Sequence, residues 1–305
     1  MWQIYSLISL FFGATEETID KATMISSKTI DLLDATWIRN AISFAISIVA
    51  AILIGGAFPV VFISFPIVIL GILYGISAIT YTVLLKQVEI TASSITTSFI
   101  PLVFLPIDLF ILNTDFLLRQ IIGIIVLVIG GVIFFYRKRS NTASITNKKI
   151  LILILIFIFL FDALLIGFES YLFKDYFANL HLSETNFLVN MWGVMFLFLT
   201  ASVISVSLYK RALPSIHLHK KYVQGSFFSK ITDYGNSFFA LKALTIASVS
   251  QVTSFTIFYP IVLLIIVMGT QKKLKVNLEE YLDHGTLIPK ICGVIIICLG
   301  AYLAR

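Results

Sequence analysis

Ionisable residues interrupt several long apolar stretches of this sequence, and they are the residues that could do chemistry. Glu17 and Glu169 lie in two such stretches at nearly corresponding places in the two halves of the chain, and Arg39 lies in a third. A charged side chain at the centre of a bilayer costs at least ~2.5 kcal/mol, so each of these residues needs a partner, a water-filled cavity or a function. A carboxylate in that setting can bind a proton or a cation, and a guanidinium can hold a carboxylate.

Ten residues form the substrate site that we predict from these stretches. They combine acidic, basic, aromatic and amide side chains: Glu17, Trp37, Arg39, Tyr81, Glu169, Asn190, Trp192, Asp233, Tyr234 and Asn236. Both signs of charge and several aromatic rings are present, which suits an amino acid, an amine or a related solute. We predict no catalytic residue, no metal site and no cofactor.

Ion pairing within the protein is the alternative role for several of these charges. Glu17 and Lys21 are four residues apart, and Lys230 and Asp233 are three apart, so each pair shares one helix face and can neutralise itself. Arg39 can pair with an aspartate of its own stretch or with a glutamate of the first stretch, because buried charges are generally paired. The cluster around Glu17 can also mark a helix end at the membrane surface. The sequence leaves these alternatives open.

Two prolines, Pro101 and Pro260, each follow a Ser/Thr-rich turn inside an apolar stretch. Proline removes a backbone hydrogen bond and frees a carbonyl oxygen, and nearby hydroxyl groups can replace the lost bond or line a pore. We predict that both prolines act as hinges in gating. Close helix packing through the small residues is the alternative interpretation.

Composition places these residues in a membrane protein. The 305-residue chain is 59% hydrophobic and only 12% charged, and its mean hydropathy is +1.00. One soluble core cannot bury that much apolar surface, so the bilayer is expected to be its solvent. The basic residues lie between the apolar stretches, where they set orientation, and no nucleic-acid binding is predicted.

The sequence contains ten apolar stretches of about the length needed to cross ~30 Å of hydrocarbon. They lie near residues 3–25, 30–55, 60–86, 90–112, 117–136, 149–174, 185–209, 224–245, 249–270 and 287–304. We therefore predict an all-α integral membrane fold with ten transmembrane helices.

Landmarks of the first half return in the second, which predicts two inverted five-helix repeats. Proline is followed in each half by a helix with two glycines seven apart, Gly123 and Gly130 and then Gly293 and Gly300; we assign these glycines to helix packing. The repeats would cover residues 1–139 and 149–305, with a basic linker at 140–148. An odd number of helices per repeat inverts the second relative to the first, a plan common in secondary transporters.

Most of the 22 lysines and arginines lie in the predicted loops on one side of the membrane. Because basic loops face the cytoplasm, we predict that both termini lie outside the cell membrane.

In the order of these landmarks the sequence resembles the EamA-type transporters of the drug/metabolite transporter superfamily. The matching residues are Arg39, Pro101, Gly123, Gly130, Pro260, Gly293 and Gly300. The chain departs from the family pattern in the seventh stretch, where Asn190 and Trp192 lie and no arginine matches Arg39. The resemblance implies an exporter or exchanger of a small metabolite that works by alternating access, as a monomer or a homodimer. Whether protons are coupled is left open.

Two functions other than transport fit parts of this sequence. Glu16, Glu17 and Lys21 resemble the glutamate motif of intramembrane CAAX-type proteases, although lysine stands in place of the arginine. All four histidines lie in predicted loops, so a metal site across helices lacks its usual ligands and we predict that the protein is not an enzyme. A membrane assembly factor without transport activity is the remaining alternative.

Overall fold

The computed structural model describes most of the chain as helix. The described residues are 1–27, 30–55, 64–87, 118–134, 161, 164–176, 179–181, 183–209, 220–247, 249, 252, 255–274 and 284–304.

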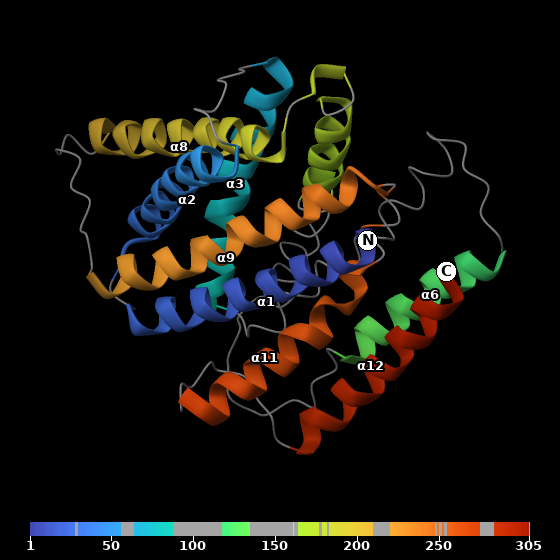
Figure 1. Ribbon diagram of the computed structural model, residues 1–305. Coiled ribbons are helices and arrows are strands. Elements are labelled where there is room, and N and C mark those ends of the chain that lie inside the picture. The colour runs from blue at the N-terminus through green and yellow to red at the C-terminus, as the bar shows by residue number, and fades with distance from the viewer. Residues whose placement is uncertain are drawn as a thin grey trace.

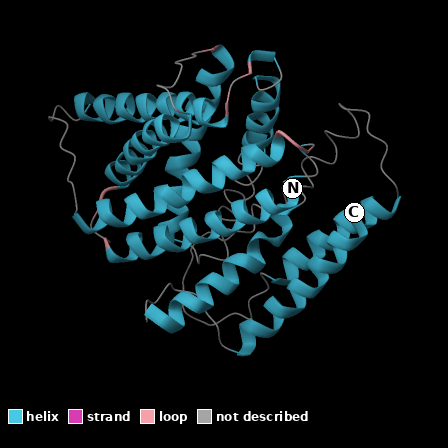
Figure 2. Cartoon of the chain, viewed as in Figure 1, coloured by secondary structure: helices cyan, strands magenta, loops and turns pink. Residues whose placement is uncertain are grey.

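Eight α-helices and one short 3-10 helix, η1, have defined bounds within this part of the chain. They are α1 (Trp2–Ser26), α2 (Leu32–Gly55), α3 (Phe65–Gln87), α6 (Leu118–Phe134), α8 (Glu184–Tyr209), α9 (Lys220–Leu244), η1 (Phe255–Phe258), α11 (Tyr259–Leu274) and α12 (His284–Ala304). Residues 164–176 are also helical. Figure 2 shows helices and loops in the described residues and no strand. The predicted all-α class is therefore confirmed.

The prediction of ten transmembrane helices is wrong. In the described residues three helical segments are long and apolar enough to cross a membrane: Leu32–Gly55, Phe65–Val83 and Glu184–Tyr209. The apolar parts of α11 and α12 are shorter, at Tyr259–Gln271 and Ile291–Gly300.

The physical reason is that we predicted a transmembrane helix for every apolar stretch of suitable length. Two of these stretches correspond to α1 and α9, whose buried charged residues have partners inside the fold. The plan of two five-helix repeats depended on that count. The predicted fourth stretch and the domain boundaries at 139, 140, 148 and 149 lie outside the described residues.

Helix α11 begins later than the apolar stretch 249–270 indicated. Pro260 lies in its first turn, directly after η1. Proline has no N–H group to donate and fits the first turn of a helix, where that group has no partner within the helix. Pro260 therefore lies at a helix start and not in a helix interior.

The helices pack as a bundle of crossing pairs. Helix α1 packs along α9, α2 packs on both α8 and α9, and α3 packs on α8. Helix α11 lies against α1, and α6 and α12 run side by side at one edge of the molecule (Figure 1). A core of fully buried side chains, including Leu70, Phe173 and Phe187, joins α3, residues 164–176 and α8.

Many large apolar side chains point outward, whereas many polar ones are buried. Leu53 is 78% exposed, Leu197 62% and Ile295 62%, while Asp20 and Lys21 are each 1% exposed. Exposed apolar side chains in such numbers suit a surface that faces a partner or a membrane. This distribution and the three long apolar helices are compatible with a membrane protein.

The contact between α6 and α12 depends on glycine. Gly123, Gly130, Gly293 and Gly300 are all buried. A Cβ atom added at Gly130 would lie 2.8 Å from the backbone nitrogen of Ile297 and 3.1 Å from the carbonyl oxygen of Gly293. Neither backbone atom can move without shifting its helix, so Gly130 supports the packing role that we assigned to these glycines.

We expect Gly130→Ala to lower the free energy of unfolding by ~1–3 kcal/mol, because the methyl group overpacks a backbone contact. Gly269→Ala is the matched control: it adds the same methyl group in α11, where none of the described residues has an atom within 4 Å of the new Cβ. Helix propensity alone should stabilise that variant by ~0.5–1 kcal/mol. Thermal unfolding of the two proteins in detergent measures both effects. A midpoint for Gly130→Ala at or above that of Gly269→Ala would show that α6 and α12 do not need this close approach.

Candidate functional site

A cavity of about 410 Å³ lies at the centre of the crossing helices. Helices α1, α2, α3, α8, α9 and α11 and residues 164–176 all contribute to its wall. Its volume is within the ~300–1,000 Å³ typical of small-molecule sites. Small side chains leave this room, because Ser77 and Ala78 of α3 and Ser237 and Ala240 of α9 stand where larger residues would fill it.

Two buried cations tie three helices together beside this cavity. Arg39 of α2 forms an ion pair with Asp20 of α1 and lies 3.7 Å from Glu16. Lys230 of α9 lies 2.7 Å from Glu16 and 2.7 Å from Asp233. Because removing one member of a buried ion pair leaves the other charge uncompensated, these contacts fix α1, α2 and α9 relative to one another.

A serine completes the buried pair around Asp20. The hydroxyl of Ser229 on α9 donates to Asp20 Oδ1 at 2.5 Å, and the Arg39 guanidinium donates to Oδ2. The guanidinium carbon also lies 5.1 Å from the centre of the Tyr81 ring, which gives a cation–π contact. Both carboxylate oxygens of Asp20 therefore have a donor, as a charge 1% exposed requires.

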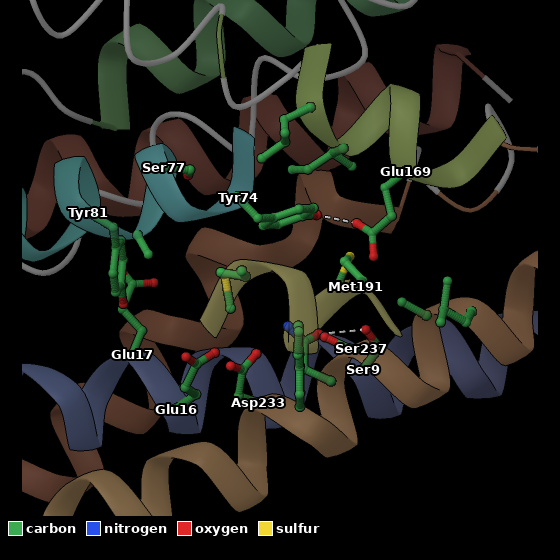
Figure 3. A pocket seen from close by; sticks show the side chains of 18 of the residues that line it. Ser9, Glu16, Glu17, Tyr74, Ser77, Tyr81, Glu169, Met191, Asp233 and Ser237 are labelled. Carbon is green, nitrogen blue, oxygen red and sulfur yellow. Dashed lines mark hydrogen bonds between the residues drawn. The ribbon is translucent and has the colours of Figure 1, made fainter. Parts of the chain in front are cut away.

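Two other carboxylates of the cavity accept hydrogen bonds from tyrosines. Tyr259 donates to Glu17 Oε2 at 2.7 Å, joining α11 to α1. Tyr74 of α3 donates to Glu169 Oε2 (Figure 3). Each contact joins a carboxylate on one helix to a phenol on another, so both are connections across the cavity wall.

Seven of the ten predicted site residues line this cavity. They are Glu17, Arg39, Tyr81, Glu169, Trp192, Asp233 and Asn236. Figure 3 shows Glu16 and Asp233 side by side on one side of the cavity and Glu169 on the opposite side. The structure thus brings together residues that lie far apart in the sequence.

The other three predicted residues support the wall. Trp37 donates its ring N–H to the hydroxyl of Thr200 at 2.9 Å. The Asn190 amide donates to the carbonyl oxygen of Asn186 at 2.7 Å. The Tyr234 ring packs edge-on against Trp192, with ring centres 5.9 Å apart. These side chains position neighbours of the cavity and do not line it.

The structure also bears on the ion-pair alternatives. Lys230 and Asp233 pair as their spacing indicated, and Arg39 pairs with the first helix. The main partner of Arg39, however, is Asp20, which sequence reasoning had not chosen. Lys21 donates to the carbonyl oxygen of Leu85 at 2.8 Å.

Several lining residues are absent from the predicted set. Glu16, Tyr74 and Tyr259 line the cavity, as does Lys230. Tyr74 lies seven residues before Tyr81 on α3, so the two share one helix face, and this periodicity was a signal that could have identified it. No local pattern pointed to Tyr259.

The described residues say less about the predicted hinges and about metal binding. Pro101 lies outside the described residues, and the hinge role of Pro260 stays a prediction. In the described part of the chain no group of three or more histidines, cysteines and carboxylates is placed to hold a metal ion. The described side chains of the cavity offer ion pairing, hydrogen bonding and aromatic contact.

We expect Asp20→Asn to lower the free energy of unfolding by ~3–5 kcal/mol, because the buried guanidinium of Arg39 loses its ion-pair partner. Unfolding in detergent, followed by circular dichroism, measures the loss. Asp175→Asn is the control, since Asp175 is exposed and accepts a hydrogen bond only from the nearby Asn179 in the described residues.

A double variant, Asp20→Leu with Arg39→Met, separates charge from packing. It removes both charges and should recover much of the lost stability. If the double variant is no more stable than Asp20→Asn, the unpaired charge is not the cause.

Comparisons with known proteins give the fold and nothing more. No family model matches the sequence, and no curated protein matches it. Among the solved structures 27 chains match. One, described only as "Crystal structure of protein", has a TM-score of 0.67 and 12% sequence identity over 99% of this chain and 97% of that chain. At that identity the likeness shows that this arrangement of helices also occurs in a crystal structure, over nearly the whole length of both chains.

Proposed function

We propose that the protein is a membrane transporter that moves a small solute, such as an amino acid, an amine or a related metabolite, through the central cavity. The observation that carries this proposal is the cavity itself, which places buried charged and aromatic side chains inside a helical protein with an apolar exterior. Ionisable groups inside such a protein are costly, and they typically mark a solute or ion pathway.

The contacts around the cavity suit alternating access, in which the walls separate on one side at a time. Tyr259 connects α11 to Glu17 of α1, and Tyr74 connects α3 to Glu169. Both connections are polar contacts between helices, and water or a solute can replace the partners as a wall opens. The packed apolar side chains behind them keep each wall intact.

Coupling to protons or exchange of one solute for another forms part of the proposal. Glu17 and Glu169 each accept a hydrogen bond from a tyrosine and line the cavity. A carboxylate there can carry a proton in one direction and release it when a solute binds. We also propose EamA-type membership, a location in the cell membrane and outward-facing termini, on the motifs and the loop charges of the sequence.

Reconstituted flux tests the proposal. The purified chain is placed in liposomes that contain a pH-sensitive dye, and a panel of amino acids and monoamines is added from outside. We expect at least one solute to move protons through the wild-type protein between about pH 5 and pH 8, and flux to fall about tenfold or more in Glu17→Gln and Glu169→Gln.

The same assay includes a control on the helix of Glu169. Asp175→Asn changes an exposed carboxylate and should transport like the wild type. Wild-type rates and pH dependence in both glutamine variants would eliminate proton coupling through these two residues. If no solute in the panel moves, by dye or by radiolabel, the transport proposal itself fails.

A further inference from the structure

We infer that the ligand of the central cavity is an organic cation, an amine with an aromatic or apolar body. This inference deepens the proposed function, because it names the class of solute that the transporter would carry. It rests on the charges and aromatic rings of the cavity wall.

The charge balance of the wall favours a cation. Its described lining holds four carboxylates and two basic groups: Glu16, Glu17, Glu169, Asp233, Arg39 and Lys230. Both basic groups are already engaged, because Lys230 contacts Glu16 and Asp233 at 2.7 Å and Arg39 pairs with Asp20. Glu169 has no basic partner in the described part of the chain, where Tyr74 is its hydrogen-bond donor. An ammonium group would therefore neutralise a carboxylate that an anionic ligand would meet with repulsion.

Glu169 is positioned to hold the ammonium group. Its carboxylate lies across the cavity from Asp233, and Tyr74 donates to one oxygen, Oε2 (Figure 3). The two oxygens of a carboxylate offer about four acceptor positions, so a ligand N–H can bind while the tyrosine stays in place. The phenol also fixes the orientation of the carboxylate before a ligand arrives.

The rest of the cavity wall suits the aromatic or apolar part of such an amine. Tyr74 and Trp192 offer aromatic rings, and Met191, Met195 and Leu165 offer apolar surface. Aromatic faces attract cations that have lost part of their water. The wall already shows one example, since the Arg39 guanidinium lies over the ring of Tyr81.

Binding of four probes with a shared phenyl ring tests the inference. The probes are phenethylamine, its β-hydroxylated form, 2-phenylethanol and 3-phenylpropionate, and the protein is the full chain in detergent or lipid nanodiscs. Thermal stabilisation and calorimetry should show binding of both amines, about tenfold or more tighter than the alcohol and the acid.

Glu169→Gln keeps the shape of the side chain and removes its charge. It should weaken amine binding about tenfold or more and leave binding of 2-phenylethanol unchanged, whereas Asp175→Asn should leave both unchanged. Amines that bind no better than the alcohol, or that bind Glu169→Gln as tightly as the wild type, overturn the cation site.

Flux measurements separate this inference from the proposed function. Amines that bind at this site but cross the membrane no faster than in protein-free liposomes would confirm the cation site and contradict transport. Flux of the acid in preference to the amines would confirm transport and overturn the cation inference.

Discussion

The buried ion pair between Arg39 and Asp20 is the interaction on which the rest of the site depends. Charges this far from water are tolerated only where partners and hydrogen bonds are fixed, and here the partners come from three helices, because Ser229 donates to the same carboxylate. That requirement turns α1, α2 and α9 toward one another. Glu16 lies one helical turn before Asp20, so the same orientation directs it at Arg39 and Lys230.

The helices were predictable from the sequence because their signals are local. Apolar runs indicated α8 at 185–209, and the helix spans Glu184–Tyr209. The number of transmembrane spans was not predictable in the same way, because hydropathy does not reveal which charges find partners. Glu16 and Asp20 of α1 contact Arg39 and Lys230, which come from other helices. Whether such a helix crosses a membrane alone or packs inside a bundle depends on tertiary contacts that a window of sequence does not contain.

The site was predictable in part for a related reason. The rule that an ionisable residue in an apolar stretch needs a partner or a function found Glu169 and Asp233, since it needs only one residue and its surroundings. The same rule did not identify the tyrosines that orient the carboxylates, because a tyrosine is ordinary in an apolar helix. Tyr259 is 242 residues from Glu17, and only the fold places its hydroxyl there. Which residues become partners at that separation depends on how all the helices of the bundle pack.

The cavity wall holds more carboxylates than basic groups, and this has a consequence for the transport that we propose. An empty cavity that changes the side to which it opens must carry its uncompensated charge through a closed, poorly hydrated state, where an unpaired ion is far more costly than in water. A proton on Glu169 or an ammonium group beside it removes that cost. In the transporter that we propose, reorientation would then be favourable only when the cavity holds one or the other, and exchange of a cation for protons would need no separate coupling device. Arg39 and Lys230 already contact carboxylates of their own, so Glu17 and Glu169 are the carboxylates to which our proposal gives this role.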